Sequence, residues 1–184
     1  VDLVAFTGHK YLLGPAGTGG LYISPAVDLE PVWVGGTGIL SELAEMPPNL
    51  PVRFDTGTPN DPSFAGLGQA LLWQRENPPD IPKIEARLER LAAGLTELGA
   101  KVVDWRGPHT PVLSFILPGW EVEEIGEILY KSFDIVCRTG LHCAPLIHSY
   151  IGAAPRGTVR FSLSRFTTDE EVEYVLSAMR GIVG

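Results

Sequence analysis

The sequence of 184 residues contains no apolar run long enough to cross a membrane. It also lacks a stripe of lysine and arginine, and its net charge of −8 at pH 7 is the wrong sign for binding nucleic acid. Internal repeats and low-complexity tracts are absent as well. We therefore expect neither a membrane nor a nucleic acid among its partners.

Cysteine is scarce, with Cys137 and Cys143 the two in the chain. Two thiols cannot form the disulfide framework of a small secreted domain, so we expect a reducing, cytoplasmic setting in which a thiol is either buried or reactive. No signal peptide is recognisable, because the chain opens at Val1 on a predicted core strand. A start without Met is expected of a segment from the middle of a larger protein.

The first residues, VDLVAF, form an almost continuous apolar run that predicts a strand buried on both faces of a sheet. Thr7, Gly8, His9 and Lys10 follow, before a glycine-rich loop, so Lys10 is expected near a bend between two strands. A lysine there either snorkels to water or is a partly desolvated amine that can form a Schiff base. In the second case Thr7 and His9 could contact a phosphate and a flat cofactor ring beside the amine.

The middle of the chain contains a loop and a helix. Residues 25–52 are rich in proline and glycine, which predicts a loop that either is functional or crosses to a partner chain, or else is a mobile surface excursion. Asp61 and Pro62 are predicted to start a helix that runs to about Asn77. The break at 77–80 marks a boundary between two expected domains, 1–79 and 80–184.

The second domain is predicted to be a compact α+β unit. Apolar residues at helical spacing indicate helices after Pro82, over 121–133 and from Thr168 onwards, where Glu171 completes a capping box. Strands are expected over 101–105, 112–117 and 158–162.

A second polar cluster lies where a strand breaks into a loop, over 135–145. Arg138 and His142 are positive neighbours that would favour the thiolate of Cys143, which is therefore either reactive or an ordinary loop cysteine. Cys137 lies in an apolar run and is expected to be a buried small hydrophobe. A zinc site formed by these two cysteines, His142 and His148 is poorly spaced, and no metal is expected.

Arg160 lies in the predicted strand over 158–162. Its guanidinium could bind a carboxylate through two parallel hydrogen bonds, and a salt bridge at the end of the strand is the alternative.

Several segments resemble the class V aminotransferase family, in particular its cysteine desulfurases: DLVAFTGHK at 2–10, FDTGTPN at 54–60, RTGLHCA at 138–144 and TVRFS at 158–162. The third is similar to the motif of group II cysteine desulfurases and selenocysteine lyases. The resemblance implies that Lys10 carries pyridoxal 5′-phosphate (PLP) as a Schiff base, with Thr7 and His9 beside it. It also implies a homodimer, because Thr58 matches a threonine that reaches the cofactor phosphate of the neighbouring subunit.

The resemblance further implies that Cys143 takes sulfur from the substrate and that Arg160 binds its carboxylate, with Arg138 and His142 also at the substrate. The implied reaction converts L-cysteine, or L-selenocysteine, to L-alanine and leaves the sulfur on Cys143 as a persulfide. A sulfur-acceptor protein would then take the sulfur for sulfur mobilisation, as in iron–sulfur cluster assembly.

The implied fold class is α/β and α+β, namely the C-terminal part of the large domain of a PLP fold-type I enzyme followed by a small α+β domain. The first half of the family's chain would precede Val1, including its ring-stacking histidine, the aspartate that pairs with the pyridine nitrogen and a second phosphate-binding loop. The alternatives are another class V activity, such as a lyase or transaminase, and a non-catalytic folding or dimerisation fragment.

Overall fold

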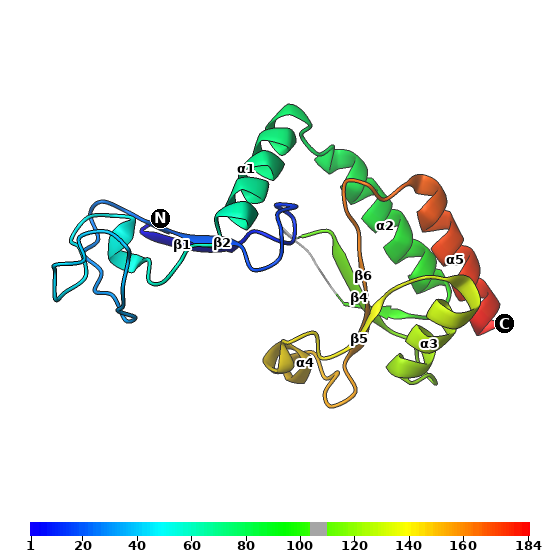
Figure 1. The fold of residues 1–184 in the computed structure, drawn as a ribbon. Coiled ribbons are helices and arrows are strands. Elements are labelled where there is room, and N and C mark those ends of the chain that lie inside the picture. Colours follow the sequence, from blue (N-terminus) through cyan, green and yellow to red (C-terminus); the bar gives the residue numbers. More distant parts are fainter. Residues whose placement is uncertain (104–109) are drawn as a thin grey trace. The chain divides into compact units, whose positions relative to one another are not determined.

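The computed structural model describes residues 1–103 and 110–184. It divides the chain into two compact units, Val1–Pro78 and Pro79–Gly184, whose elements are labelled in Figure 1. Within the described residues, no helix is both long and apolar enough to span a membrane.

The first unit begins with a hairpin. β1 (Leu3–Thr7) pairs antiparallel with β2 (Gly19–Ile23), which confirms that Lys10 lies between two strands of one sheet. The prediction that the first strand is buried on both faces is wrong for this chain, because every residue of β1 is exposed. The reason is that the sheet has two strands in the part of the chain that the structure describes.

A 3-10 turn, η1 (Val52–Phe54), and the helix α1 (Asp61–Glu76) follow the long loop. Asn60 caps α1, since its side chain accepts a hydrogen bond from the backbone of Ser63 at 3.4 Å. The helix therefore begins as predicted, although the cap lies one residue earlier than Asp61.

α1 packs on the loop between β1 and β2. Leu67 is buried against Gly8 and Gly14, and the side-chain amide of Gln74 donates to the carbonyl oxygen of Leu12 at 2.8 Å. These contacts fix the loop that carries Lys10.

The second unit contains an antiparallel four-stranded sheet of order β3-β4-β6-β5. The predicted strand over 158–162 is confirmed, while the one expected over 101–105 extends into residues outside the described part. The strands are β3 (Lys101–Val102), β4 (Val112–Ile116), β6 (Thr158–Ser162) and β5 (Arg138–Gly140).

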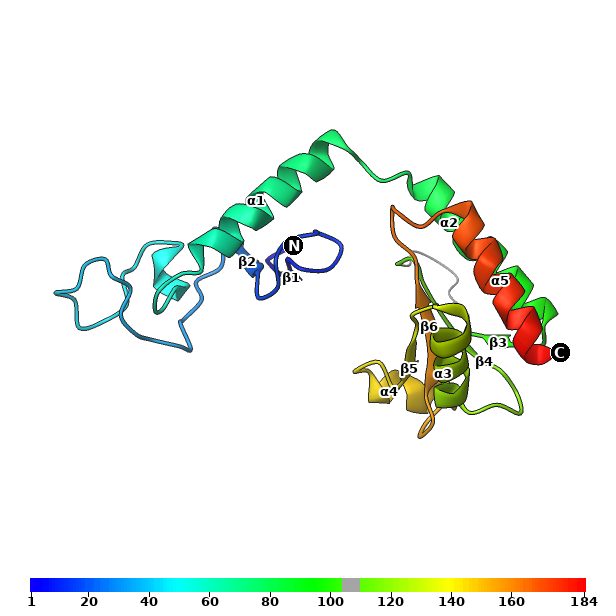
Figure 2. The ribbon, with the colours of Figure 1, turned by 45° about the vertical axis from the view of Figure 1, so that its right-hand side comes forward.

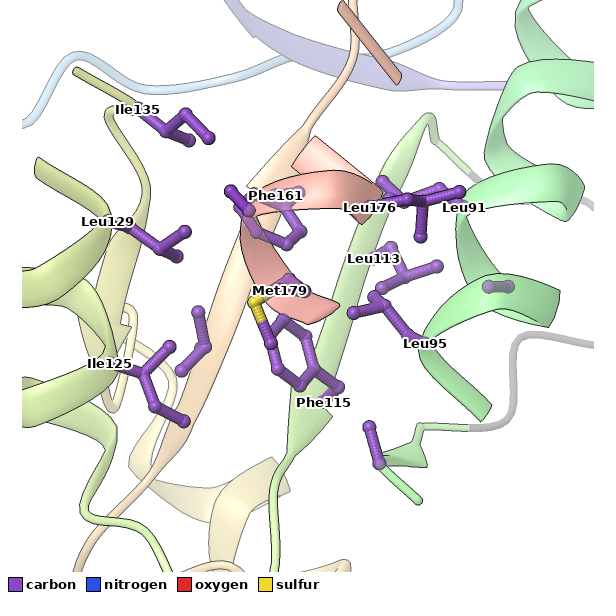
Figure 3. Packing of buried hydrophobic residues seen from close by; sticks show 14 of the residues in the cluster. Leu91, Leu95, Leu113, Phe115, Ile125, Leu129, Ile135, Phe161, Leu176 and Met179 are labelled. Carbon is purple, nitrogen blue, oxygen red and sulfur yellow. The ribbon is translucent and has the colours of Figure 1, made fainter. Parts of the chain in front are cut away.

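Three helices, all predicted from helical spacing, cover one face of this sheet: α2 (Ile81–Glu97), α3 (Val122–Phe133) and α5 (Asp169–Val183). Phe115 and Phe161 point from β4 and β6 into the core beneath these helices, and their rings stack with centroids 5.5 Å apart (Figure 3).

The opposite face of the sheet carries one short helix, α4 (Pro145–Tyr150), which the sequence did not predict. Figure 2 shows α4 on the side of β5 and β6 away from α3. Six residues are too few for helical spacing to be visible in a sequence. The two faces of the sheet thus differ, because one is buried under the core helices and the other is free to form a site.

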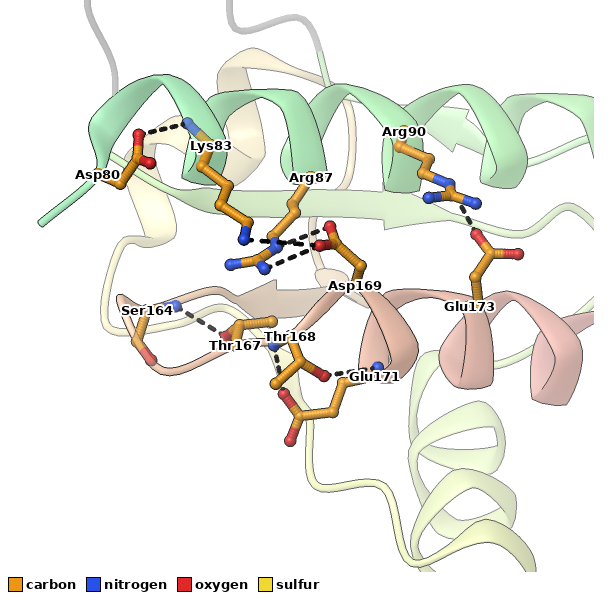
Figure 4. Close-up of polar contacts among 10 residues, drawn as sticks. All are labelled: Asp80, Lys83, Arg87, Arg90, Ser164, Thr167, Thr168, Asp169, Glu171 and Glu173. Carbon is orange, nitrogen blue, oxygen red and sulfur yellow. Dashed lines mark hydrogen bonds and ion pairs between the residues drawn. The ribbon is translucent and has the colours of Figure 1, made fainter.

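Polar contacts fix α5 against α2 (Figure 4). Thr168 and Glu171 form the predicted capping box. The guanidinium of Arg87 donates two hydrogen bonds to Asp169, at 2.9 and 3.0 Å, and this contact lowers the pKa of the Asp169 carboxyl. The capping box and the two hydrogen bonds between Arg87 and Asp169 hold the start of α5 in position along α2.

Replacing Leu88 with alanine tests the placement of the core. Leu88 is fully buried on α2, so Leu88→Ala should lower the free energy of unfolding of the second unit by about 2–5 kcal/mol in urea titrations. Glu89 is exposed on the same helix, and Glu89→Ala should change it by less than about 0.5 kcal/mol. Equal effects of the two substitutions would contradict this core.

Candidate active site

Lys10 lies in the loop between β1 and β2, and the base of this loop is tightly closed. The backbone N–H of Gly8 donates to the carbonyl oxygen of Thr18 at 2.8 Å. A Cβ atom on Gly8 would lie 2.3 Å from the hydroxyl oxygen of Thr18, so no larger residue fits there. The side chains of Thr7, His9 and Lys10 remain exposed beside this base.

The amine of Lys10 fits covalent attachment to an aldehyde such as that of PLP. The side chain is exposed, and no ion pair joins Lys10 to a carboxylate in the ranges that the structure describes. Thr7 adds a hydroxyl and His9 an imidazole within three residues. Thr58 is exposed too, between η1 and α1, and no contact described in this unit joins it to Lys10. The roles of these four residues stay predictions.

The long loop of the first unit surrounds a cavity of about 800 Å³. Arg53 ties the loop together by pairing with Asp28 at 3.3 Å and with Glu30 at 3.1 Å. None of the predicted site residues lines the cavity. The loop does contact the segment before Thr58, because the backbone N–H of Gly57 donates to the carbonyl oxygen of Gly36 at 2.8 Å.

The remaining predicted residues meet on the open face of the second unit's sheet. Arg138 on β5 lies directly opposite Arg160 on β6. Thr158 precedes Arg160 by two residues on the same strand and so shares its face, and Gly140 lies opposite Thr158. Like charges directly opposite each other destabilise a sheet, so the two arginines indicate a site for an anion.

Arg160 does not form the salt bridge that was its alternative interpretation. Among the described residues, no ion pair includes Arg160, and its Nε atom is buried without a hydrogen-bond partner. A buried donor without a hydrogen bond destabilises the protein, and a ligand that accepts from this donor removes the cost. The geometry therefore favours binding of a carboxylate.

Cys143 lies just beyond β5 in a strained turn. The φ angles are 52° at His142 and 60° at Cys143, in the left-handed region that non-glycine residues rarely adopt. The Cys143 thiol is exposed, and Nη2 of Arg138 donates to its sulfur at 3.1 Å. A guanidinium in contact stabilises a thiolate, and strain of this kind gathers at functional sites. Both observations support a reactive Cys143.

Cys137 has a different environment, as predicted. Its side chain is half-buried and packs against the hydrophobic core, and this burial raises the pKa of the Cys137 thiol. A thiol with a raised pKa is a poor source of thiolate. Of the two cysteines, Cys143 is the candidate nucleophile.

His142 and His148 share one hydroxyl group. Nε2 of His142 lies 2.9 Å from Oγ1 of Thr158, and Nε2 of His148 lies 3.3 Å from the same atom. Burial, and to a smaller extent the charges of Arg160, His148 and Arg138, lower the pKa of His142 to about 4. His142 is therefore neutral at neutral pH, so the expectation that it is a positive neighbour of Cys143 is wrong, and Arg138 is the cation in contact with the sulfur.

Sequence reasoning missed Thr158 and considered His148 only as a zinc ligand. The signal for Thr158 was the period of two along a strand, which places it on the same face as Arg160. Nothing in the sequence indicated the contact made by His148, because it depends on α4. Throughout ranges 1–103 and 110–184, no group of three or more histidine, cysteine, aspartate or glutamate side chains is placed to hold a metal ion.

The predicted site residues thus fall into two groups. Arg138, His142, Cys143 and Arg160 belong to the second unit, where the structure brings them together around β5 and β6. Thr7, His9, Lys10 and Thr58 belong to the first unit.

Comparisons with known proteins bear on both units. Residues 1–175 match the family described as Aminotransferase class-V. A probable cysteine desulfurase from Methanothermobacter thermautotrophicus is 32% identical over 194 residues, a match that covers 100% of this chain and 48% of that relative.

Comparison with solved structures agrees with these sequence matches. The apo structure of a cysteine desulfurase from Thermococcus onnurineus matches with a TM-score of 0.86 and 30% identity, over 99% of this chain and 47% of that one. A cystine C-S lyase, solved with its reaction product cysteine persulfide, matches with a TM-score of 0.72 and 26% identity, over 97% and 46%. The chain spans about half the length of these proteins, and the predicted fold class, a part of a PLP fold-type I enzyme, is confirmed.

The environment of His142 predicts an unusual titration. In the folded chain its ring resonances should keep neutral shifts above about pH 5.5 and titrate near pH 4, because burial and neighbouring cations oppose its charge. The chain unfolded in urea is the control, and there His142 should titrate near 6.5. Since the unfolded state binds this proton more tightly, His142 should make the fold less stable as pH falls from 6.5 to about 4. Titration of the folded chain between pH 6 and 7 would contradict the described burial.

Proposed function

Because the chain belongs to the class V aminotransferase family, we propose that it forms part of a PLP-dependent cysteine desulfurase. The observation that carries the proposal is the hydrogen bond from Arg138 to the exposed sulfur of Cys143, at 3.1 Å, on a sheet face that also holds Arg160. An exposed thiol that accepts from Arg138, on a face where Arg160 has no ion-pair partner among the described residues, suits attack on a bound amino acid. Similarity to proteins named cysteine desulfurase supports the same reaction.

In the proposed reaction, L-cysteine and the thiol of Cys143 become L-alanine and a persulfide on Cys143. The Cys143 thiolate attacks the substrate sulfur, so that an S–S bond forms as the substrate's C–S bond breaks. The electron pair of that bond goes to the carbon, which takes up a proton. Arg160 holds the substrate carboxylate and so fixes the orientation of the sulfur, while Arg138 favours the thiolate.

The first unit supplies the attachment point of the cofactor. Lys10 would hold PLP through a Schiff base, with Thr7 and His9 beside it and Thr58 at the cofactor phosphate of a partner subunit in a homodimer. When bound, PLP supplies an electron sink for bonds that break at the substrate's carbon atoms. The amine of Lys10 also serves as the base that holds and returns a proton during the reaction.

The exposed position of Cys143 supports transfer of its sulfur to an acceptor protein. We place this sulfur mobilisation, with iron–sulfur cluster assembly as one use, in the reducing cytoplasm that free thiols require. L-Selenocysteine would present the same carboxylate and a heavier atom at the same position. A C–S lyase activity that does not use Cys143 is the second candidate, favoured by the likeness to a cystine C-S lyase.

Borohydride reduction tests the role of Lys10. In the whole protein loaded with PLP, reduction followed by peptide mass spectrometry should find a phosphopyridoxyl group on Lys10, because a Schiff base becomes a stable amine. Lys101 and Lys131 are exposed lysines of the second unit and serve as internal controls. A label on either of these in place of Lys10 would overturn the assignment.

Two cysteine substitutions test the sulfur transfer. In the whole protein, Cys143→Ala should retain PLP but lower sulfide release from L-cysteine at least about 100-fold, because the nucleophile is lost. Cys137→Ala is the matched control, and it should keep activity with a small loss of stability, because Cys137 packs on the core. The measurements are alanine and sulfide production.

The same pair of variants separates the alternatives. Undiminished turnover in Cys143→Ala would move the assignment to the lyase or to another class V activity. Equal losses in both variants would indicate a folding defect instead of a chemical one.

A further inference from the structure

In the hydrogen bonds around Thr158, the donor and the acceptor can be assigned from the chemical groups involved. Nδ1 of His148 lies 2.8 Å from the carbonyl oxygen of Ala144. A carbonyl oxygen can only accept, so this nitrogen carries the hydrogen. In a neutral ring with its hydrogen on Nδ1, Nε2 of His148 is an acceptor.

The acceptor role of Nε2 of His148 determines which atom is the donor in the hydrogen bond between Thr158 and His142. The hydroxyl of Thr158 has one hydrogen, and we assign it to the contact with Nε2 of His148 at 3.3 Å, because donation to Nε2 of His142 would leave lone pairs of the Thr158 oxygen and of Nε2 of His148 facing each other. The Thr158 oxygen is then free to accept from Nε2 of His142 at 2.9 Å. Thr158 is fully buried, so water does not compete for these positions. His142 therefore carries its hydrogen on Nε2 and a lone pair on Nδ1.

The lone pair on Nδ1 of His142 has no hydrogen-bond partner in the part of the chain that the structure describes. That atom is buried and without a hydrogen bond, as is Nε of Arg160. One is an acceptor and the other a donor, and both belong to the same polar cluster, since the charge of Arg160 acts on His142. An α-amino acid has the complementary groups, a carboxylate that accepts and an ammonium or thiol that donates.

We propose that Thr158 and His148 are positioning residues that hold His142 as the Nε2–H tautomer and so present its Nδ1 as a hydrogen-bond acceptor to a donor group of the amino-acid substrate. The identity of that substrate, L-cysteine, rests on the proposed function. The tautomer itself does not, because it follows from hydrogen bonds within the second unit.

Nuclear magnetic resonance of histidine ring nitrogens tests the tautomer directly. The chain has four histidines, and protonated and unprotonated ring nitrogens differ widely in ¹⁵N shift. At pH 8, without cofactor or substrate, His142 should show an unprotonated Nδ1 and a protonated Nε2. Its signals are assigned by their absence from His142→Gln.

Substitution of Thr158 separates positioning from packing. Thr158→Val replaces the hydroxyl with a methyl group of similar size, so both tautomers should become populated and the two nitrogen shifts of His142 should move toward each other. Thr158→Ser keeps a hydroxyl and should restore the single tautomer. A protonated Nδ1 in the unsubstituted chain, or an unchanged tautomer in Thr158→Val, would overturn the proposal. If Thr158→Val does not fold, the ring spectrum of the unsubstituted chain still tests the tautomer of His142.

Kinetics of the PLP-loaded whole protein tests the contact with substrate. Thr158→Val should raise KM for L-cysteine by the factor by which it depletes the Nε2–H tautomer, about twofold where the two tautomers are equally populated, with a smaller change in kcat, and Thr158→Ser should restore KM. Mixed tautomers with an unchanged KM would overturn the assignment of Nδ1 to the substrate. If the unsubstituted protein releases no sulfide, the proposed function fails, while the ring spectra still decide the tautomer.

Discussion

The alternating pleat of β6 is the constraint on which both the core and the candidate site depend. Val159 and Phe161 are buried beneath the helices of the second unit, while Thr158 and Arg160 point to the opposite face. A shift of one residue in the pairing of β6 would exchange these two sets. Burial of Val159 and Phe161 therefore also places Arg160 on the open face. The same strand pairing thus determines both the stability of the fold and the geometry of the site.

The charges on the open face are arranged for a ligand that is itself charged. The chain is acidic overall, yet Arg138 and Arg160 lie opposite each other across β5 and β6. Arg138 donates a hydrogen bond to the sulfur of Cys143, whereas Nε of Arg160 is buried without a hydrogen-bond partner. His142 adds no charge at neutral pH because its pKa is low. Two cations placed in this way complement an anionic ligand such as a carboxylate.

Lys10 is positioned by contacts within the first unit, at the base of the loop between β1 and β2. Close approach of Gly8 to Thr18 closes the base of its loop, and Leu67 of α1 packs on that base. The exposed faces of β1 contrast with the buried strands of the second unit, where three helices cover the sheet. The loop that carries the amine thus depends on its own closed base and on α1, whereas the thiol and the arginines depend on a sheet with a complete core.

The sequence by itself determined the features that arise from neighbours along the chain. Helical spacing predicted α2, α3 and α5, the Thr168 capping box marked the start of α5, and short motifs pointed to Lys10 and Cys143, because such signals need only a few adjacent residues. Tertiary structure alone decided the exposure of β1, the helix α4 and the contacts of Thr158 with two histidines. These depend on how many strands a sheet contains and on the register of β5 against β6, which joins residues far apart in the sequence.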